Sequence, residues 1–206
     1  AGELPTDEPL WSGENRLSDV ERENILKNQN LDHVGVYPAV RWGACVRRSN
    51  LRRLPVQKTV TREKNDRYDD VLQESAVLTG EPLVILHESE DALFYFAVVC
   101  FGMGWIAAED VGVSESYEVW RAMQAGEKLM VTGSSVRLCC DPYEPEVSAR
   151  TLTMGERLRL AAPPGTVRPL RGRVSYDNYM VELPRRTPEG GLDWVEMLVP
   201  VSADVH

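Results

Sequence analysis

The clearest alternation of apolar and polar positions lies between residues 71 and 113. Pro82–His87 is an almost continuous apolar run whose length and β-branched content are typical of a buried strand. Leu93–Val99 follows after a polar loop and is rich in aromatic and β-branched residues. Gly102 and Gly104 then permit a tight bend before the next apolar residues. Short strands in quick succession, with no long helix between them, predict a small, strongly bent barrel.

The C-terminal half repeats this pattern with different loop lengths. The segments that match in order are Asn50–Arg52 with Ser135–Arg137, Thr79–Leu83 with Met154–Leu158, and Phe94–Val98 plus Trp105 with Tyr179–Leu183 plus Trp194. Thr187–Gly191 has the composition of a hairpin turn. Two copies of one unit predict a tandem of two barrels, and the fold class is all-β with small helices.

Helix signals divide the chain further. Residues 1–38 are expected to form an N-terminal arm with one short helix, because Ser18 and Glu21 have the spacing of a capping box. The first barrel would span 39–113, with a charged loop between residues 55 and 70, and the second 127–206. Residues 114–126 would form a connecting helix that Ser114 opens and Gly126 stops, with Tyr117, Trp120 and Met123 on one face.

Composition and charge narrow the function classes. The chain has 206 residues and a formal net charge of −9, which argues against general nucleic-acid binding. No apolar run approaches the length of a membrane span, and the N-terminal residues do not resemble a signal peptide. The four cysteines include no Cys-x-x-Cys pair, so we predict free thiols, no metal site and no cofactor.

Candidate catalytic residues are lacking. Cysteine nucleophiles need a histidine within hydrogen-bond reach, yet His33, His87 and His206 lie in a connector, a predicted strand and the last position. Paired acids such as Asp69-Asp70 and Glu109-Asp110 sit in turns or loops, where solubility explains them. The chain as it stands is therefore not expected to be an enzyme, and a binding role is favoured.

The order and spacing of several segments resemble a known family. These segments are Val46–Pro55, Leu72–Ala76, Gly80–Pro82, Leu86–Ser89, Gly104–Ile106 and the final Leu198–His206. Together they resemble the N-terminal tandem bacterial SH3-like region of NlpC-type cell-wall cysteine peptidases, which cut γ-D-glutamyl-L-diamino-acid bonds in peptidoglycan peptides. The resemblance implies two SH3-like barrels, a bacterial periplasmic or cell-envelope location, peptidoglycan stem peptides as partners, and a catalytic domain that follows His206.

The resemblance also implies a binding site in the first barrel, where a glutamate and an aromatic residue contact the free N-terminal L-Ala of the stem peptide. Glu74 matches that glutamate, although a local salt bridge explains it equally well. The family pattern has a tyrosine where this chain has Gly102, with Phe101 beside it. Trp105 completes the candidate set, with a core position as its alternative.

Two other interpretations stay open beside this one. The chain would also suit a stand-alone peptidoglycan-targeting module without enzymatic activity, or a binder of proline-rich peptides, which needs an aromatic-lined groove. A basic cluster, Arg47, Arg48, Arg52 and Arg53, would meet the carboxylates of wall peptides or of a neighbouring domain, or would form a solvated strand face.

Overall fold

The computed structural model describes residues 2–6, 8–35 and 39–206. These residues form two compact units. The N-terminal unit takes the described residues of 1–41 together with 49–77 and 83–109, and the C-terminal unit takes 42–48, 78–82 and 110–206. Both are built from short antiparallel strands, so the predicted class, all-β with small helices, is confirmed.

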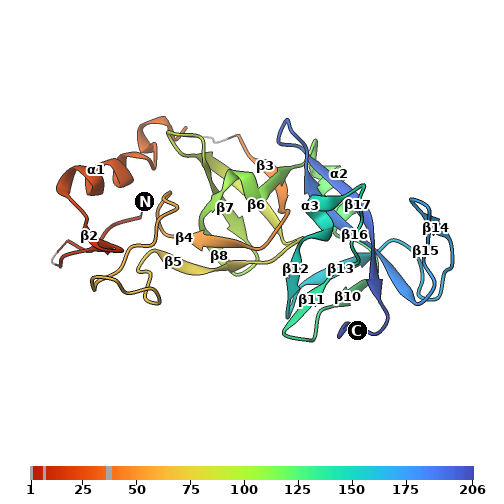
Figure 1. Ribbon diagram of the computed structural model, residues 1–206. Coiled ribbons are helices and arrows are strands. Elements are labelled where there is room, and N and C mark those ends of the chain that lie inside the picture. Colours follow the sequence, from red (N-terminus) through yellow and green to blue (C-terminus); the bar gives the residue numbers. More distant parts are fainter. Residues whose placement is uncertain (1, 7, 36–38) are drawn as a thin grey trace. The chain divides into compact units, whose positions relative to one another are not determined.

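An antiparallel sheet forms the body of the N-terminal unit (Figure 1). Its strands, in spatial order, are β5 (Gln73–Val77), β4 (Ser49–Arg52), β8 (Gly102–Ala107), β7 (Phe94–Val99) and β6 (Pro82–Glu88). Alternate residues such as Leu51, Ile85 and Ile106 are almost completely buried, as the period of two in a strand requires.

The bend predicted at Gly102 and Gly104 is wrong. Both glycines lie within strand β8 without a positive φ, and the turn falls at Cys100 and Phe101. Gly104 serves a different purpose: a Cβ there would lie 2.8 Å from the Arg52 carbonyl oxygen and 3.1 Å from Leu51 Cγ. The residue is small because strand β4 passes close to it.

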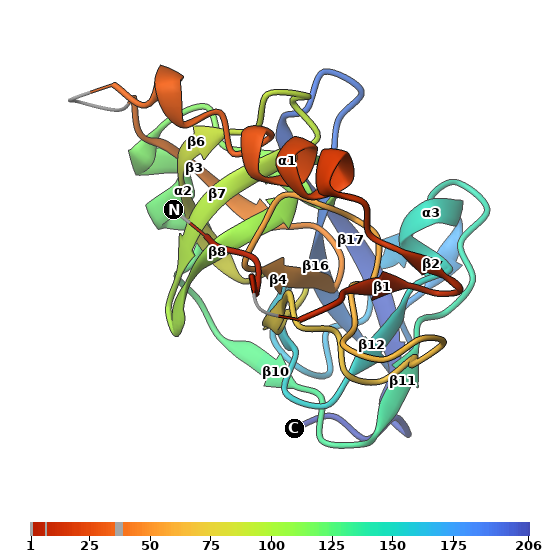
Figure 2. The same ribbon diagram turned by 90° about the vertical axis from the view of Figure 1, so that its left-hand side faces the viewer.

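The N-terminal arm packs on this sheet's loops. It contains a hairpin of two short strands, β1 (Trp11–Ser12) and β2 (Asn15–Arg16), followed by helix α1 (Asp19–Lys27). Figure 2 shows all three elements. The predicted capping box is confirmed, since Ser18 accepts from the Glu21 N–H and Glu21 from the Ser18 N–H. The buried side chains that join arm and loops are Leu4, Leu10, Leu17, Ile25, Leu54, Val60 and Leu72.

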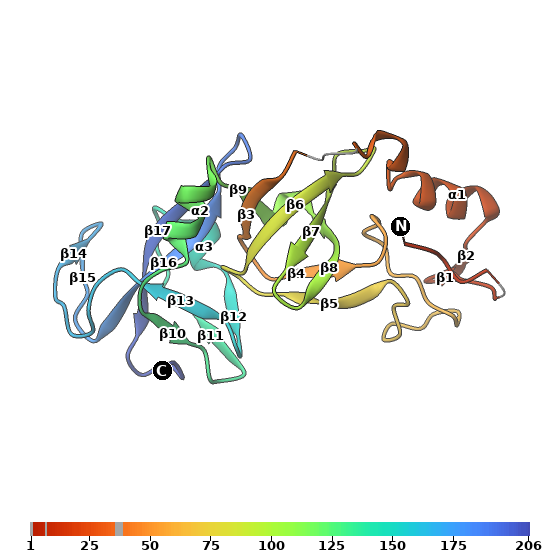
Figure 3. The ribbon, with the colours of Figure 1, turned by 180° about the vertical axis from the view of Figure 1, so that it is seen from behind.

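The C-terminal unit contains a four-stranded antiparallel sheet and additional strand pairs (Figure 3). The sheet order is β10 (Lys128–Met130), β13 (Arg157–Leu160), β16 (Asn178–Arg186) and β17 (Leu192–Pro200). The pairs are β11 (Ser135–Arg137) with β12 (Thr151–Thr153), β14 (Pro169–Leu170) with β15 (Arg173–Val174), and β3 (Arg41–Cys45) with β9 (Val111–Val113). Its largest core cluster includes Leu152, Leu158, Val181, Leu183, Met197 and Val199.

Strand pairing repeats in the two halves of the chain, as predicted. Pairs β4–β5, β6–β7 and β7–β8 recur as β11–β12, β13–β16 and β16–β17. The turn before the third strand of each copy uses a glycine with positive φ, 79° at Gly80 and 89° at Gly155. Residues 42–48, 78–82 and 110–113 belong to the C-terminal unit. The predicted boundaries of two separately folded barrels stay a prediction.

Short helical elements complete the fold: α2 (Tyr117–Met123), α3 (Pro145–Ser148) and the 3₁₀ turns η1 (Leu31–His33) and η2 (Ala108–Asp110). Helix α2 begins later than predicted. Ser116, not Ser114, caps it by accepting from the Val119 N–H at 3.3 Å. Among the described residues, no helix combines the length and the apolar character needed to cross a membrane.

Candidate functional site

Glu74 lies in β5 with its carboxylate accessible. Arg53 Nε donates to Glu74 Oε1 at 2.7 Å, and the two side chains are 48% and 41% exposed. An exposed pair of this kind contributes between about 0 and 1 kcal/mol to stability. The contact orients the carboxylate without removing it from solvent, so the local ion pair and a binding role are compatible.

Phe101 occupies the turn between β7 and β8 and is 51% exposed. Met103, two residues further along, is 61% exposed. Exposed aromatic and thioether side chains at one end of a hairpin provide apolar surface that a ligand would cover. Phe101 is therefore accessible at the surface, and its contact with a ligand stays a prediction.

Trp105 has a different environment. Its side chain is 2% exposed and forms a buried cluster with Phe94 and Ala107. The Trp105 ring meets Phe96 edge to face, with centroids 5.4 Å apart, and lies 6.1 Å from the His87 ring. The indole stabilises the sheet and offers no surface to a ligand in this conformation.

The three candidate residues, Glu74, Phe101 and Trp105, belong to the strands and turns of one sheet, but the described contacts do not bring them together. Strand β4 lies between β5, which carries Glu74, and β8, in which Trp105 pairs with Arg52. Sequence reasoning missed Arg53 as the partner of Glu74. The available signal was the presence of opposite charges on strands expected to be neighbours, since Arg53 adjoins β4.

The predicted basic cluster is divided among carboxylates. Arg52, with a side chain only 4% exposed, donates to Asp70 at 2.9 Å and to the Lys58 carbonyl oxygen at 2.9 Å. Arg47 pairs with Asp110. These pairs hold the charged loop and strand ends in place, and they reduce the net positive charge that wall carboxylates would meet.

Cys45 and His87 both take part in interactions within the fold. Burial raises the pKa of the Cys45 thiol well above its ordinary value, with the Asp110 charge as the next cause. His87 Nε2 donates to the backbone carbonyl oxygens of Gln29 and Asn30 at 3.1 and 3.0 Å. His87 therefore links the N-terminal arm to β6. The buried Cys45 thiol stays protonated, which makes it a poor nucleophile.

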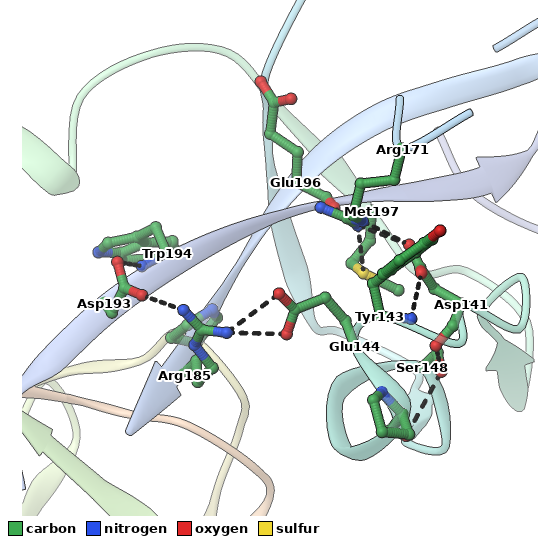
Figure 4. Close-up of polar contacts among 12 residues, drawn as sticks. Asp141, Tyr143, Glu144, Ser148, Arg171, Arg185, Asp193, Trp194, Glu196 and Met197 are labelled. Carbon is green, nitrogen blue, oxygen red and sulfur yellow. Dashed lines mark hydrogen bonds and ion pairs between the residues drawn. The ribbon is translucent and has the colours of Figure 1, made fainter. Parts of the chain in front are cut away.

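A second polar group lies in the C-terminal unit (Figure 4). Arg171 Nε donates to Asp141 Oδ2 at 2.8 Å, and its guanidinium also reaches the Glu196 carbonyl oxygen. Burial alone would raise the pKa of Asp141, but bonds from Arg171 and the Tyr143 N–H bring it below its ordinary value. Arg171 has a φ of 45° in the β14–β15 turn, so this contact fixes a left-handed residue. The contact therefore holds the β14–β15 turn against Asp141 and the backbone at Glu196.

Comparison with known proteins supports the fold. Residues 55–107 match the sequence model of an SH3 domain of the SH3b1 type. The structure of an NlpC/P60 endopeptidase from Photobacterium damselae subsp. piscicida is similar, with a TM-score of 0.68 and 16% identity. The likeness covers 93% of this chain and 39% of that one, so the chain spans well under half the length of that structure. No curated protein matches the sequence. The SH3-like architecture implied by the resemblance is confirmed.

Proposed function

We propose that this chain is the non-catalytic, cell-wall-binding region of a peptidoglycan endopeptidase, and that it forms one wall of the substrate cleft. The SH3b1 match and the likeness to part of a longer NlpC/P60 structure support this assignment. In this proposal the catalytic domain follows His206, and the protein works in the bacterial periplasm or cell envelope on peptidoglycan stem peptides.

The observation that carries the proposal is the accessible carboxylate of Glu74, held on strand β5 by Arg53. Arg53 engages Oε1, and the ammonium of a free N-terminal L-Ala binds Oε2. A charge-assisted hydrogen bond of this type is about twice as strong as a neutral one, and a partly closed cleft strengthens it. Phe101 covers the apolar methyl group and excludes water, while Trp105 keeps β8 in place.

The test is a calorimetric titration of L-Ala-γ-D-Glu-diaminopimelate into the polypeptide that includes whatever follows His206. Glu74→Gln keeps the shape of the side chain and removes its charge, so binding should weaken at least ~10-fold, or about 1.4 kcal/mol. Glu90→Gln is the matched control, because Glu90 is also an exposed acid paired with a cation, Lys27, at 3.5 Å. It should leave binding unchanged.

A peptide acetylated at its N-terminus separates ammonium recognition from general peptide binding. It should bind wild type as weakly as the free peptide binds Glu74→Gln. If acetylation and Glu74→Gln both leave affinity unchanged, the cleft role of Glu74 is wrong. Tight binding of residues 1–206 alone to intact peptidoglycan, unaffected by Glu74→Gln, would instead identify a stand-alone targeting module.

A further inference from the structure

A groove in the N-terminal unit is large enough to hold a ligand. Its volume is about 490 Å³. Small-molecule sites commonly measure roughly 300–1,000 Å³. Helix α1, labelled in Figure 2, forms one wall of the groove. The loop that follows β4 forms the second wall, and the turn between β6 and β7 forms the third.

Asn28, the C-cap residue of α1, holds the three walls together. Its Nδ2 donates to the Pro55 carbonyl oxygen at 2.8 Å and to Asp91 Oδ2 at 3.0 Å, and its Oδ1 accepts from the Asp91 N–H at 3.1 Å. The Glu90 N–H donates to the Asn28 carbonyl oxygen at 3.0 Å. The groove is therefore formed before a ligand arrives, which lowers the entropic cost of binding.

The charged side chains that line the groove already have partners. Lys27 Nζ lies 3.5 Å from Glu90 Oε1 at the exposed rim. Asp91 Oδ1 accepts from the Ser89 hydroxyl at 2.6 Å and from the Leu93 N–H at 3.0 Å. A charged ligand would have to compete with these contacts, so the groove favours an uncharged one.

Two carboxamides in the groove remain available to a ligand. Asn24 on α1 and Gln57 on the loop after β4 both line the groove and are exposed, and their side chains make no hydrogen bond within the described part of the chain. The groove also presents apolar surface, from Leu93, which is 63% exposed, and from the half-buried Val56. A carboxamide both donates and accepts, so these two match the N–H and C=O groups of a peptide backbone.

We propose that this groove binds an uncharged peptide segment that carries an apolar side chain. The side chain covers Leu93 and Val56, and the peptide groups on either side of it bond to the carboxamides of Asn24 and Gln57. Phe94 also lines the groove but is only 4% exposed, so the site lacks the open aromatic surface that binds proline-rich peptides. The groove shares no residue with the candidate site described above, so the inference stands independently of the proposed function.

The test follows the side-chain NH₂ signals of Asn24 and Gln57 in the ¹⁵N-labelled chain, assigned through Asn24→Ala and Gln57→Met. The probe is N-acetyl-L-leucine N-methylamide, which has a peptide group on each side of one apolar side chain. Both signals should shift saturably and give the same dissociation constant. N-acetylglycine N-methylamide lacks the side chain, and N-acetyl-L-leucine ends in a carboxylate. Each should bind at least ~10-fold more weakly, equivalent to about 1.4 kcal/mol.

Two variants separate the apolar contact from the hydrogen bonds. Leu93→Ser removes accessible apolar surface, so the affinity for the probe should fall at least ~10-fold. Gln57→Met keeps the length of the side chain and removes its donor and acceptor, so the affinity should fall at least ~5-fold. Leu31→Ser is the matched control, because Leu31 is also exposed but does not line the groove, and it should bind as wild type does. Dispersed amide signals in each variant verify folding.

Four results overturn the proposal. The Asn24 and Gln57 signals fail to shift saturably with the probe, or they respond equally to the glycine compound or to the carboxylate. Either Leu93→Ser or Gln57→Met binds the probe as tightly as wild type. Signals that move with protein concentration alone, with no probe added, overturn it as well, because the groove would then belong to a contact between copies of the chain.

Discussion

Glu156 is a carboxylate that the fold buries completely, with 0% of the residue exposed. Its Oε1 accepts from the Thr153 hydroxyl at 3.1 Å, while Oε2 has no hydrogen-bond partner among the described residues. Burial is the main cause that raises the pKa of Glu156 above its ordinary value of 4.5, against hydrogen bonds from Thr153. The folded state therefore binds this proton more tightly than the unfolded chain does.

This burial predicts a stability that falls with rising pH. Above pH 4.5 the unfolded chain releases the Glu156 proton while the folded chain retains it, so the free energy of unfolding decreases until the raised folded pKa is passed. The slope from one such group is at most about 1.4 kcal/mol per pH unit. Urea unfolding across pH 4–8 should show this decline in wild type and not in Glu156→Gln.

The substitution Glu156→Gln should also change the free energy of unfolding in a definite direction at neutral pH. Glutamine keeps the Thr153 bond and cannot ionise, so Glu156→Gln should be at least as stable as wild type at pH 7. Glu146→Gln, at an exposed position of α3, is the control and should retain the wild-type pH profile. A wild-type profile in Glu156→Gln would mean that another group causes the decline.

Two glycines in strand β8 give a paired prediction. A Cβ at Gly104 meets the Arg52 carbonyl oxygen at 2.8 Å, whereas a Cβ at Gly102 has nothing within 4 Å. Gly104→Ala should lower the free energy of unfolding by about 1–3 kcal/mol through overpacking. Gly102→Ala should be neutral or slightly stabilising, because alanine restricts the unfolded chain. Equal effects in thermal unfolding would contradict the close approach of β4 and β8.

At the scale of elements, local signals located much of the fold. The Ser18–Glu21 capping box and the apolar run at Pro82–His87 correspond to α1 and β6 because each is determined by residues adjacent in sequence. The start of α2 was misplaced because two serines, Ser114 and Ser116, suit the capping position equally, and only packing selects one.

Non-local features could not be predicted in this way. Gly104 is needed because of strand β4, about fifty residues earlier in the chain, and its local sequence suggested a bend instead. The candidate site was predictable only in part. Glu74 and Phe101 are accessible, but Arg53 became the partner of Glu74 through the β4–β5 pairing, and the burial of Trp105 follows from its neighbours on β6 and β7.

At the scale of the whole molecule, the C-terminal unit depends on segments that precede residue 127. Arg150 Nη1 donates to the carbonyl oxygens of Val46 and Pro184, and Trp120 Nε1 donates to the Gly43 carbonyl oxygen at 2.8 Å. Strand β9 adds further links. The Val113 N–H donates to the Gly190 carbonyl oxygen at 3.0 Å, and Gly112 packs tightly on Leu192. None of these earlier segments is contained in residues 127–206.

These links predict that residues 127–206 alone form an incomplete unit. Without residues 42–48 and 110–113, the Arg150 guanidinium loses one of its two carbonyl acceptors and the apolar surface around Leu192 is exposed. The isolated segment should melt at a lower temperature than the intact chain and show narrower amide dispersion. Adding a peptide of residues 39–48 should not restore it, because β9 would still be missing.

Melting of residues 127–206 at the temperature of the full chain would instead make the second barrel an autonomous domain with the boundary that the sequence predicts. The repeat in the sequence would then mark two independently folding copies. The lower melting temperature would mean that the repeat has become interdependent, because strands β3 and β9 serve the second unit.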